Sequence, residues 1–315
     1  MGKVAFVFPG QGAQYSGMGK EFYENFPSAR RVFEEAGDCL GMDMKSLCFE
    51  GSEEELKKTE NTQPAILTAS AAMLEVLEME GIQCEMTAGL SLGEYTSLVA
   101  SKVLDFEDAV RIVQKRGRYM QDAVPEGVGG MAAILGLKRE FLQPCIEEAS
   151  AYGLVEVANY NSPAQIVLSG EVEGVKKAAE LAKAKGARKA VILPVSAPFH
   201  SSLLKPAGMK LEGVLRRARI APPEIPVVTN TEAKILEGAQ HVIPSLVRQV
   251  SQSVRWQDSV EYMMTEGVDT FIEIGPGKTL SGFIKRIAKE NNRSVNMMNI
   301  ENVQDLKGLT ERIRV

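Results

Sequence analysis

The most constraining feature of the sequence is a serine flanked by glycines between a short apolar strand and a predicted helix. The segment GLSLG occupies residues 89–93, after the predicted strand 86–90 and at the start of a helix expected to run from Ser91 toward Ala100. Such a turn strains the backbone so that the serine hydroxyl projects from the sheet edge, and glycines are needed where neighbouring chains crowd it. Unpaired N–H groups at the helix N-terminus also favour negative charge there. This context predicts a nucleophilic serine, and the alternative is a helix-capping serine beside glycines selected for packing.

The chain around this turn alternates predicted strands with predicted helices. Val4–Phe8 is a continuous apolar run, typical of a strand buried on both faces, and a glycine-rich loop follows it. Helices are expected over 64–80, with Thr62 as the cap and Pro64 in the first turn, and over 106–121. Strands that alternate with helices predict a mostly parallel sheet with helices on both faces.

The rhythm changes after the predicted hinge PEGVGG at residues 125–130. Expected there are strands over 131–137, 154–160, 165–169 and 189–195 and helices over 138–150 and 171–185. That order is βαββαβ, the ferredoxin-like pattern, and it could form an inserted domain of about 70 residues. In the last third, predicted helices and strands alternate again as in the first part of the chain. Helices are expected over 202–217 and 244–254, short strands over 226–228 and 270–274, and a further helix ending at 289.

The predicted fold class is therefore α/β with two domains. A discontinuous, α/β-hydrolase-like catalytic domain with a mostly parallel sheet is expected over 1–125 and 198–315. A ferredoxin-like small domain is expected over 126–197.

The histidine count limits the chemistry that the chain can perform. Only His200 and His241 occur, which excludes a zinc site built on several histidines, and the four cysteines form no C-x-x-C pair. No metal site is expected, and the cysteines should be reduced thiols of a cytosolic protein.

A nucleophilic serine needs a base. His200 lies between a predicted strand and helix whereas His241 is expected in an exposed loop, so His200 is favoured; the alternative is a packed structural histidine.

Arg116 is the cation that discriminates between functions. At about 100° per residue, Ala109, Val113, Arg116 and Met120 share one apolar face of the predicted helix, while the other cations lie opposite. A buried guanidinium without a partner is very costly, and its planar fork suits a carboxylate. Either a substrate carboxylate or an internal Asp or Glu could be that partner, and the sequence leaves both open.

Composition and the remaining motifs exclude several other classes. The net charge of −5 argues against a dedicated nucleic-acid binder, and no apolar run approaches the roughly 18 residues of a membrane helix. No secretory signal is visible, so a cytoplasmic protein is expected. The loop after the first strand fails the dinucleotide fingerprint because Tyr15 replaces the third glycine, and Ile272 likewise breaks a phosphate-loop match at Gly277-Lys278-Thr279.

With these residues in place, the chain resembles the malonyl-CoA:acyl-carrier-protein transacylase family over nearly its whole length. Many segments carry the resemblance in order and spacing, and they extend from the first strand to the last third of the chain. They are PGQGAQYSGMG, TQPAILTAS, GLSLGEYTSLVA, RGRYMQ, NSPAQIVLSG, SAPFHSSLLKPA and EIGPGKTLSG.

The resemblance implies a role for each candidate site residue. Ser91 is the nucleophile that carries malonyl as an ester, His200 is the general base, and Arg116 pairs with the malonyl carboxylate. The backbone N–H groups of Gln11 and Leu92 form the oxyanion hole. The main-chain carbonyl of Gln249 orients the histidine, and Phe199 leaves no room for a methyl branch. Asn161, Gln165 and Lys189 fall where the family lines its coenzyme A cleft.

The resemblance also implies substrates and partners. The substrates are malonyl-CoA and an acidic acyl carrier protein, with no cofactor beyond the coenzyme A thioester itself, and a monomer is expected without nucleic acid or membrane. Many members have histidine where Leu90 stands here, which removes one hydrogen bond. The pathway is fatty-acid synthesis; alternatives are a trans-acting malonyltransferase of a polyketide synthase, a serine esterase or thioesterase, and a non-catalytic binder of coenzyme A or carrier protein.

Overall fold

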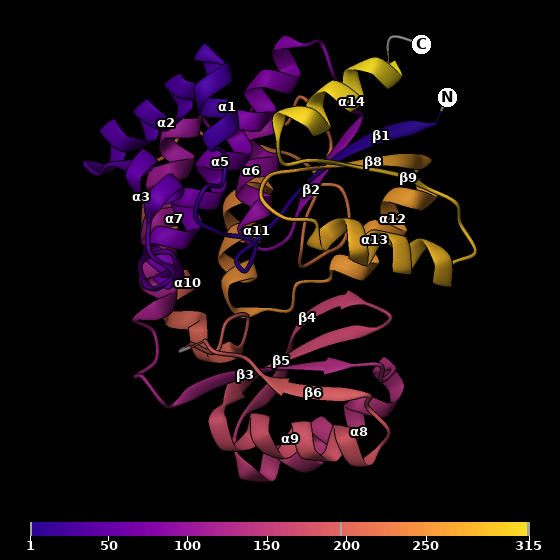
Figure 1. The fold of residues 1–315 in the computed structure, drawn as a ribbon. Helices are drawn as coiled ribbons and strands as arrows, with labels where there is room; N and C mark the ends of the chain where they lie inside the picture. The colour runs from indigo at the N-terminus through magenta and orange to yellow at the C-terminus, as the bar shows by residue number, and fades with distance from the viewer. Residues whose placement is uncertain (1, 196, 314–315) are drawn as a thin grey trace.

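A five-stranded parallel sheet forms the centre of the larger part of the molecule (Figure 1). The structure is a computed structural model that describes residues 2–195 and 197–313. The strands run in the order β7-β2-β1-β8-β9, and every neighbouring pair is parallel. Their bounds are Lys3–Phe8 for β1, Met86–Gly89 for β2, Val227–Val228 for β7, Val268–Ile274 for β8 and Asn296–Ile300 for β9.

Helices cover both faces of this sheet because β1 is apolar on both sides. Phe6 and Phe8 pack into one large hydrophobic cluster, and Ala5 and Val7 pack into another on the opposite face. The helices are α1 (Lys20–Asn25), α2 (Pro27–Leu40), α3 (Met44–Glu50), α4 (Glu53–Lys57), α5 (Thr59–Met79), α6 (Gly93–Ala100), α7 (Phe106–Gln121), α10 (Lys205–Leu215), α11 (Ala239–Ser251), α12 (Trp256–Thr265), α13 (Thr279–Glu290) and α14 (Val303–Ile313). None of the helices within the described residues is long and apolar enough to span a membrane.

A separate four-stranded antiparallel sheet lies on one side of the larger unit, with two helices on its outer face (Figure 1). Its order is β4-β5-β3-β6. The elements are β3 (Gly129–Leu135), α8 (Arg139–Ala149), a short 3-10 turn (Ser150–Tyr152), β4 (Val155–Ser162), β5 (Gln165–Glu171), α9 (Val172–Ala184) and β6 (Lys189–Ile192). The structure therefore contains the predicted parallel sheet and a second sheet built from elements in the order βαββαβ. The strand β6 ends three residues earlier than predicted.

The start of α5 differs from the prediction. The helix begins at Thr59, so Pro64 lies inside it rather than in its first turn. The residues before Pro64 are largely buried, and burial against neighbouring helices, more than the proline signal, sets where the helix starts. The region 202–217 also divides, with a 3-10 turn over Ser202–Leu204 before α10.

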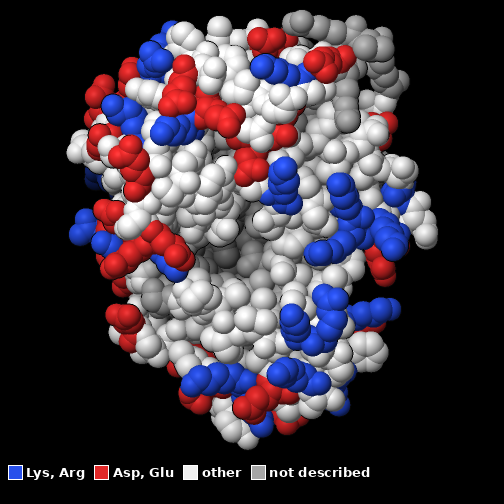
Figure 2. All heavy atoms as spheres, viewed as in Figure 1, with Lys and Arg blue, Asp and Glu red and all other residues white. Residues whose placement is uncertain are grey.

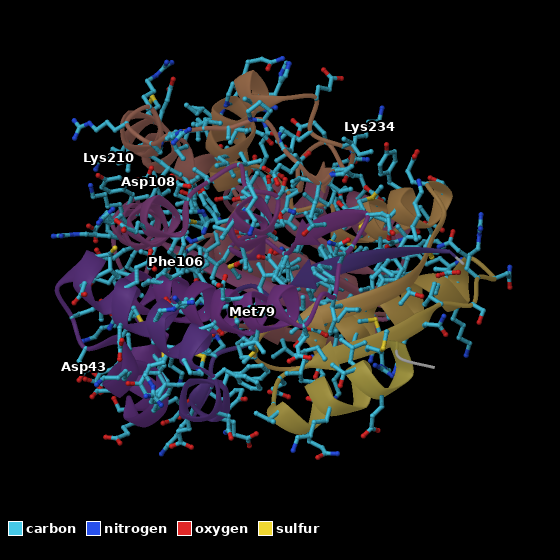
Figure 3. The ribbon with its side chains drawn as sticks, turned by 90° about the horizontal axis from the view of Figure 1, so that it is seen from above. Asp43, Met79, Phe106, Asp108, Lys210 and Lys234 are labelled. Carbon is cyan, nitrogen blue, oxygen red and sulfur yellow. The ribbon has the colours of Figure 1, made fainter. Side chains whose placement is uncertain are left out.

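The helix α7 has the predicted bounds and packs between α5 and α10. Figure 3 shows Phe106 and Asp108 at its start, with Lys210 of α10 nearby. Asp108 Oδ2 accepts a hydrogen bond from the Arg219 backbone N–H at 3.2 Å, which ties the start of α7 to the chain after α10. This packing holds the apolar face of α7, and with it Arg116, inside the molecule.

The contact between α5 and α7 depends on Gly117. A Cβ at this position would lie 2.4 Å from the Thr59 carbonyl oxygen, whereas one at Gly282 of α13 would meet nothing within 4 Å. We expect Gly117→Ala to lower the free energy of unfolding by about 2 kcal/mol, because backbone cannot move aside cheaply. Gly282→Ala should instead raise it by up to about 1 kcal/mol through helix propensity. Chemical denaturation measures both, and equal effects of the two substitutions would contradict this packing.

Candidate active site

The loops that follow three parallel strands meet at the carboxyl edge of the larger sheet, where open α/β sheets bind ligands. Ser91 follows β2 and has a left-handed backbone, with φ of 52°. The helix α6 begins at Gly93, two residues later than predicted. A Cβ at Gly89 would lie 1.9 Å from the Gly93 carbonyl carbon, and one at Gly93 would lie 2.1 Å from the Phe8 oxygen. Glycine is required at both positions because backbone approaches closely there, and Ser91 adopts the strained turn that the sequence predicts.

Asn230, in the loop after β7, holds this turn from behind. Its side-chain Oδ1 accepts a hydrogen bond from the Ser91 backbone N–H at 2.7 Å, and its Nδ2 donates to the Gly89 carbonyl at 2.7 Å. Both ends of one amide therefore bridge the residues on which the bend depends. No local sequence signal pointed to Asn230, which is 139 positions away from Ser91.

His200 is placed against the Ser91 hydroxyl. Its Nε2 lies 2.7 Å from Ser91 Oγ, and its Nδ1 lies 2.8 Å from the main-chain oxygen of Gln249 in α11. Because a carbonyl only accepts, Nδ1 carries the proton and Nε2 is left to accept from the serine. Burial and the nearby charge of Arg116 lower the pKa of His200 to about 3, so the imidazole is neutral at physiological pH.

Arg116 lies beside the same hydroxyl and is 1% exposed. Its Nη1 donates to Gln63 Oε1 at 2.8 Å, and its Nη2 donates to Gln249 Oε1 at 3.0 Å and to Ser91 Oγ at 3.1 Å. Its guanidinium carbon also lies 5.4 Å from the Tyr95 ring centroid. Among the residues that the structure describes, no Asp or Glu forms an ion pair with it, so the internal ion pair is not its explanation.

A cavity of about 920 Å³ opens in front of these side chains, between the larger sheet and the antiparallel one. Figure 2 shows the corresponding hollow at the centre of this face. Most of the predicted site residues line the cavity. They are Gln11, Ser91, Leu92, Arg116, Asn161, Gln165, Phe199 and His200.

The other predicted residues occupy different places. Gln249 is fully buried behind the cavity, where its carbonyl faces His200. Lys189 is an exposed residue of β6 and does not line the cavity. Asn161 Nδ2 donates to Gln165 Oε1 at 2.9 Å on the wall formed by the antiparallel sheet. Within the described chain, the backbone N–H groups of Gln11 and Leu92 donate to no other residue, which leaves two free donors at the cavity.

Sequence reasoning misplaced one residue and missed others. His241 lies in the first turn of α11 rather than in a loop, although it is exposed as expected. Gln63, Glu94 and Asn230 are buried polar residues of the site to which the sequence assigned no role. Gln63 lies in the stretch 62–74 of α5, which is buried on every side, so periodicity carries no signal there. Within the described residues, no group of three or more His, Cys, Asp or Glu side chains could hold a metal ion.

Comparison with known proteins identifies relatives along the whole length of the chain. The model of the acyl transferase domain family matches residues 5–309. A protein named malonyl CoA-acyl carrier protein transacylase from Bacillus subtilis is 49% identical over 288 residues, which cover 91% of each chain. The protein of the same name from Escherichia coli K12 is 46% identical over 288 residues, 91% of this chain and 93% of its own.

Solved structures give the same result. The malonyl CoA-acyl carrier protein transacylase from Clostridium perfringens is 46% identical with a TM-score of 0.95, covering 99% of this chain and 97% of its own. A malonyl-transacylase solved in complex with a type II polyketide synthase acyl-carrier protein is 41% identical with a TM-score of 0.95, covering 98% and 99%. These matches confirm the resemblance predicted from the sequence motifs. The chain therefore belongs to the acyl transferase family.

Proposed function

We propose that the protein transfers the malonyl group from malonyl-CoA to the phosphopantetheine thiol of acyl carrier protein, through an ester on Ser91, for fatty-acid synthesis. The observation that carries this proposal is the buried guanidinium of Arg116, which lies 3.1 Å from the Ser91 hydroxyl and forms no direct ion pair with a carboxylate among the described residues. A site that places an unpaired cation beside a nucleophile favours an acyl group that itself bears a carboxylate. The names of the relatives support the same substrates.

In the first half-reaction, Arg116 holds the malonyl carboxylate and the thioester carbonyl lies over Ser91. His200 Nε2 takes the hydroxyl proton while Oγ forms a bond to the carbonyl carbon. The free N–H groups of Gln11 and Leu92 stabilise the oxyanion, each by roughly 3–4 kcal/mol in comparable sites. The carbon–sulfur bond then breaks, and coenzyme A leaves with the proton that His200 returns.

The second half-reaction runs the same steps in reverse with the carrier protein's thiol. His200 takes the thiol proton, sulfur attacks the malonyl ester, and the proton returns to Ser91 Oγ as the ester bond breaks. Ping-pong kinetics follow from the shared ester. The antiparallel sheet forms one wall of the cavity and limits access of water to the ester. The reaction needs no cofactor beyond the thioester substrates.

The same proposal includes the finer fold assignment. Residues 1–125 and 198–315 would form an α/β-hydrolase-like domain, and 126–197 a ferredoxin-like one. The support is the serine turn after β2 at the carboxyl edge of a parallel sheet, and the order β3-α8-β4-β5-α9-β6 in the small unit.

We further propose a cytoplasmic monomer that binds neither nucleic acid nor membrane. Phe199 beside the cavity would exclude branched acyl groups, and Asn161 and Gln165 would contact coenzyme A.

Two other functions lead to different expectations. A serine esterase or thioesterase of neutral substrates has no use for Arg116 in its pocket. A polyketide-associated malonyltransferase would use the same chemistry with another carrier protein, and one structural relative was solved with such a carrier. Purified carrier proteins of the two kinds, compared as acceptors, distinguish the pathways.

Replacing Arg116 separates malonyl transfer from ester hydrolysis. In Arg116→Ala we expect the rate of malonyl-ester formation to fall by about 100-fold relative to acetyl-ester formation, since a charge-assisted pair contributes roughly 1.5–3 kcal/mol. Intact-protein mass spectrometry after mixing with malonyl-CoA or acetyl-CoA measures both esters. Arg118→Ala, an exposed cation of the same helix, is the matched control and should leave the ratio unchanged.

Ser91→Ala calibrates that experiment because it removes the attacking oxygen. No adduct should form on it with either thioester. An adduct retained in Ser91→Ala would contradict the nucleophile assignment. A malonyl-to-acetyl ratio in Arg116→Ala equal to that of the unmodified enzyme would contradict the carboxylate role.

Basic side chains gather on one side of the central hollow, over α13, while acidic side chains gather on the other (Figure 2). Lys285, Arg286 and Lys289 of α13 are exposed, and Arg188 and Lys189 at the start of β6 form a second basic pair. We propose that the α13 group steers the acidic carrier protein to the cavity, as charge complementarity raises association rates.

Charge reversal tests that docking surface. The double substitution Lys285→Glu, Arg286→Glu should raise the KM for carrier protein by about tenfold at low salt, and the effect should shrink at high salt. The KM for malonyl-CoA should stay within about twofold. Steady-state kinetics measure both, with Arg30→Glu, Arg31→Glu on α2 as the matched reversal. An unchanged KM for carrier protein would exclude the α13 group and leave the β6 pair.

A further inference from the structure

A buried carboxylate lies behind the catalytic residues and takes no part in the mechanism derived above. Glu94, in the first turn of α6, is 1% exposed. Its Oε2 accepts hydrogen bonds from the Asn230 backbone N–H at 2.9 Å and from Gln249 Nε2 at 2.8 Å. Among the described residues no cation forms an ion pair with it, so its contacts are to neutral groups of the site.

Gln249 connects this carboxylate to the three residues of the proposed reaction, Ser91, Arg116 and His200. The donor end of its amide, Nε2, faces the Ser91 main-chain oxygen at 2.9 Å, Glu94 Oε2 at 2.8 Å and Asn230 Oδ1 at 3.3 Å. The acceptor end, Oε1, faces Arg116 Nη2 at 3.0 Å. Its main-chain oxygen accepts from His200 Nδ1. One residue thus positions the base through its backbone and the cation through its side chain.

The orientation of the Gln249 amide decides whether Arg116 meets an acceptor. If the amide turned over, Nε2 would face the Arg116 donors and Oε1 would face the oxygens of Ser91 and Glu94. In its ionised form, Glu94 favours the observed orientation, because a carboxylate can only accept hydrogen bonds. The main-chain oxygen of Ser91 has the same restriction but lacks the charge, so the carboxylate makes the stronger bond.

We propose that Glu94 is a positioning residue for acyl selectivity: it holds the Gln249 amide with Oε1 toward Arg116, and so fixes the guanidinium where an acyl carboxylate can bind. This inference rests on the proposed function, in which Arg116 receives the malonyl carboxylate. Burial raises the pKa of Glu94 to about 7, while the bonds from Gln249 and Asn230 and the charge of Arg116 act to lower it. The contacts that orient Gln249 are therefore also those that favour the charged form.

A purely structural role for Glu94 makes a different prediction. Glu94 also ties the Asn230 loop to α6, and Asn230 holds the turn at Ser91. If that tie were its whole function, loss of Glu94 would slow the attack of Ser91 on every thioester equally. If Glu94 acts through Gln249 on Arg116, malonyl-ester formation should suffer more than acetyl-ester formation.

The test compares the rates at which malonyl-CoA and acetyl-CoA acylate Ser91 in two variants of the full-length enzyme. Glu94→Ala removes both accepted bonds, and we expect the malonyl-to-acetyl rate ratio to fall about tenfold or more. Glu94→Gln keeps the shape and one acceptor oxygen but not the charge, and we expect a fall of about threefold. Ser97→Ala removes a buried hydroxyl of the same helix that donates to the Glu94 main-chain oxygen and does not touch its carboxylate, and it should leave the ratio unchanged.

A double-mutant cycle shows whether the effect passes through Arg116. In an Arg116→Ala background, adding Glu94→Ala should change the remaining ratio by less than about twofold, because residues that act as one unit are not additive. Equal slowing of both thioesters by Glu94→Ala, or a full additive loss in the double variant, would overturn the inference.

The remaining outcomes are also decisive. If Glu94→Ala does not fold, an unchanged ratio in Glu94→Gln overturns the inference on its own. If the unmodified enzyme forms no malonyl ester, the proposed function itself has failed. If the unmodified enzyme prefers malonyl-CoA and the Glu94 variants keep that preference, only the inference about Glu94 has failed.

Discussion

The site depends on a buried guanidinium that forms no direct ion pair with any carboxylate in the part of the chain that the structure describes. Removing such a charge from water costs several kcal/mol even after the surrounding protein relaxes. Arg116 recovers part of that cost through neutral acceptors, the side-chain oxygens of Gln63 and Gln249 and the Ser91 hydroxyl. Neutral acceptors leave most of the charge uncompensated, so a carboxylate that enters the cavity gains more there than a neutral acyl group would.

The same cation affects the base. His200 is buried, and both this burial and the charge of Arg116 lower its pKa, so the imidazole stays neutral and able to accept the serine proton. A histidine oriented by a carboxylate would behave differently, since a nearby negative charge stabilises the protonated form. The Gln249 main-chain oxygen orients His200 without adding a charge. Orientation and acidity are thereby set by separate groups.

The parts of the structure that sequence predicted are those with local causes. Helical periodicity placed α7 and put Arg116 on its buried face, and both follow from residues within one helix. The turn at Ser91 follows from Gly89 and Gly93, because a Cβ at either position would collide with backbone. Alternating strands and helices were enough to predict a parallel sheet and a second unit with βαββαβ element order.

The parts that sequence did not predict depend on contacts between distant segments. Asn230 and the Gln249 side chain approach Ser91 from segments 139 and 158 residues away. The family resemblance implied a role for the main-chain oxygen of Gln249 but none for its side chain, and nothing near Asn230 indicates a site. The short helices α1, α3 and α4 and the edge strand β9 were also missed, because brief segments carry little periodicity. The longer helix α2 was missed although its amphipathic pattern is strong. The start of α5 was misplaced because burial overrode the proline signal.

The most direct measurement is a crystal structure of the enzyme carrying malonyl on Ser91. We expect the two oxygens of the malonyl carboxylate to accept hydrogen bonds from Nη1 and Nη2 of Arg116, at about 3 Å. We also expect Gln249 to keep its amide oxygen toward the guanidinium. A carboxylate that points into solvent, or that binds another cation while Arg116 keeps only its amide partners, would contradict the proposed role of Arg116.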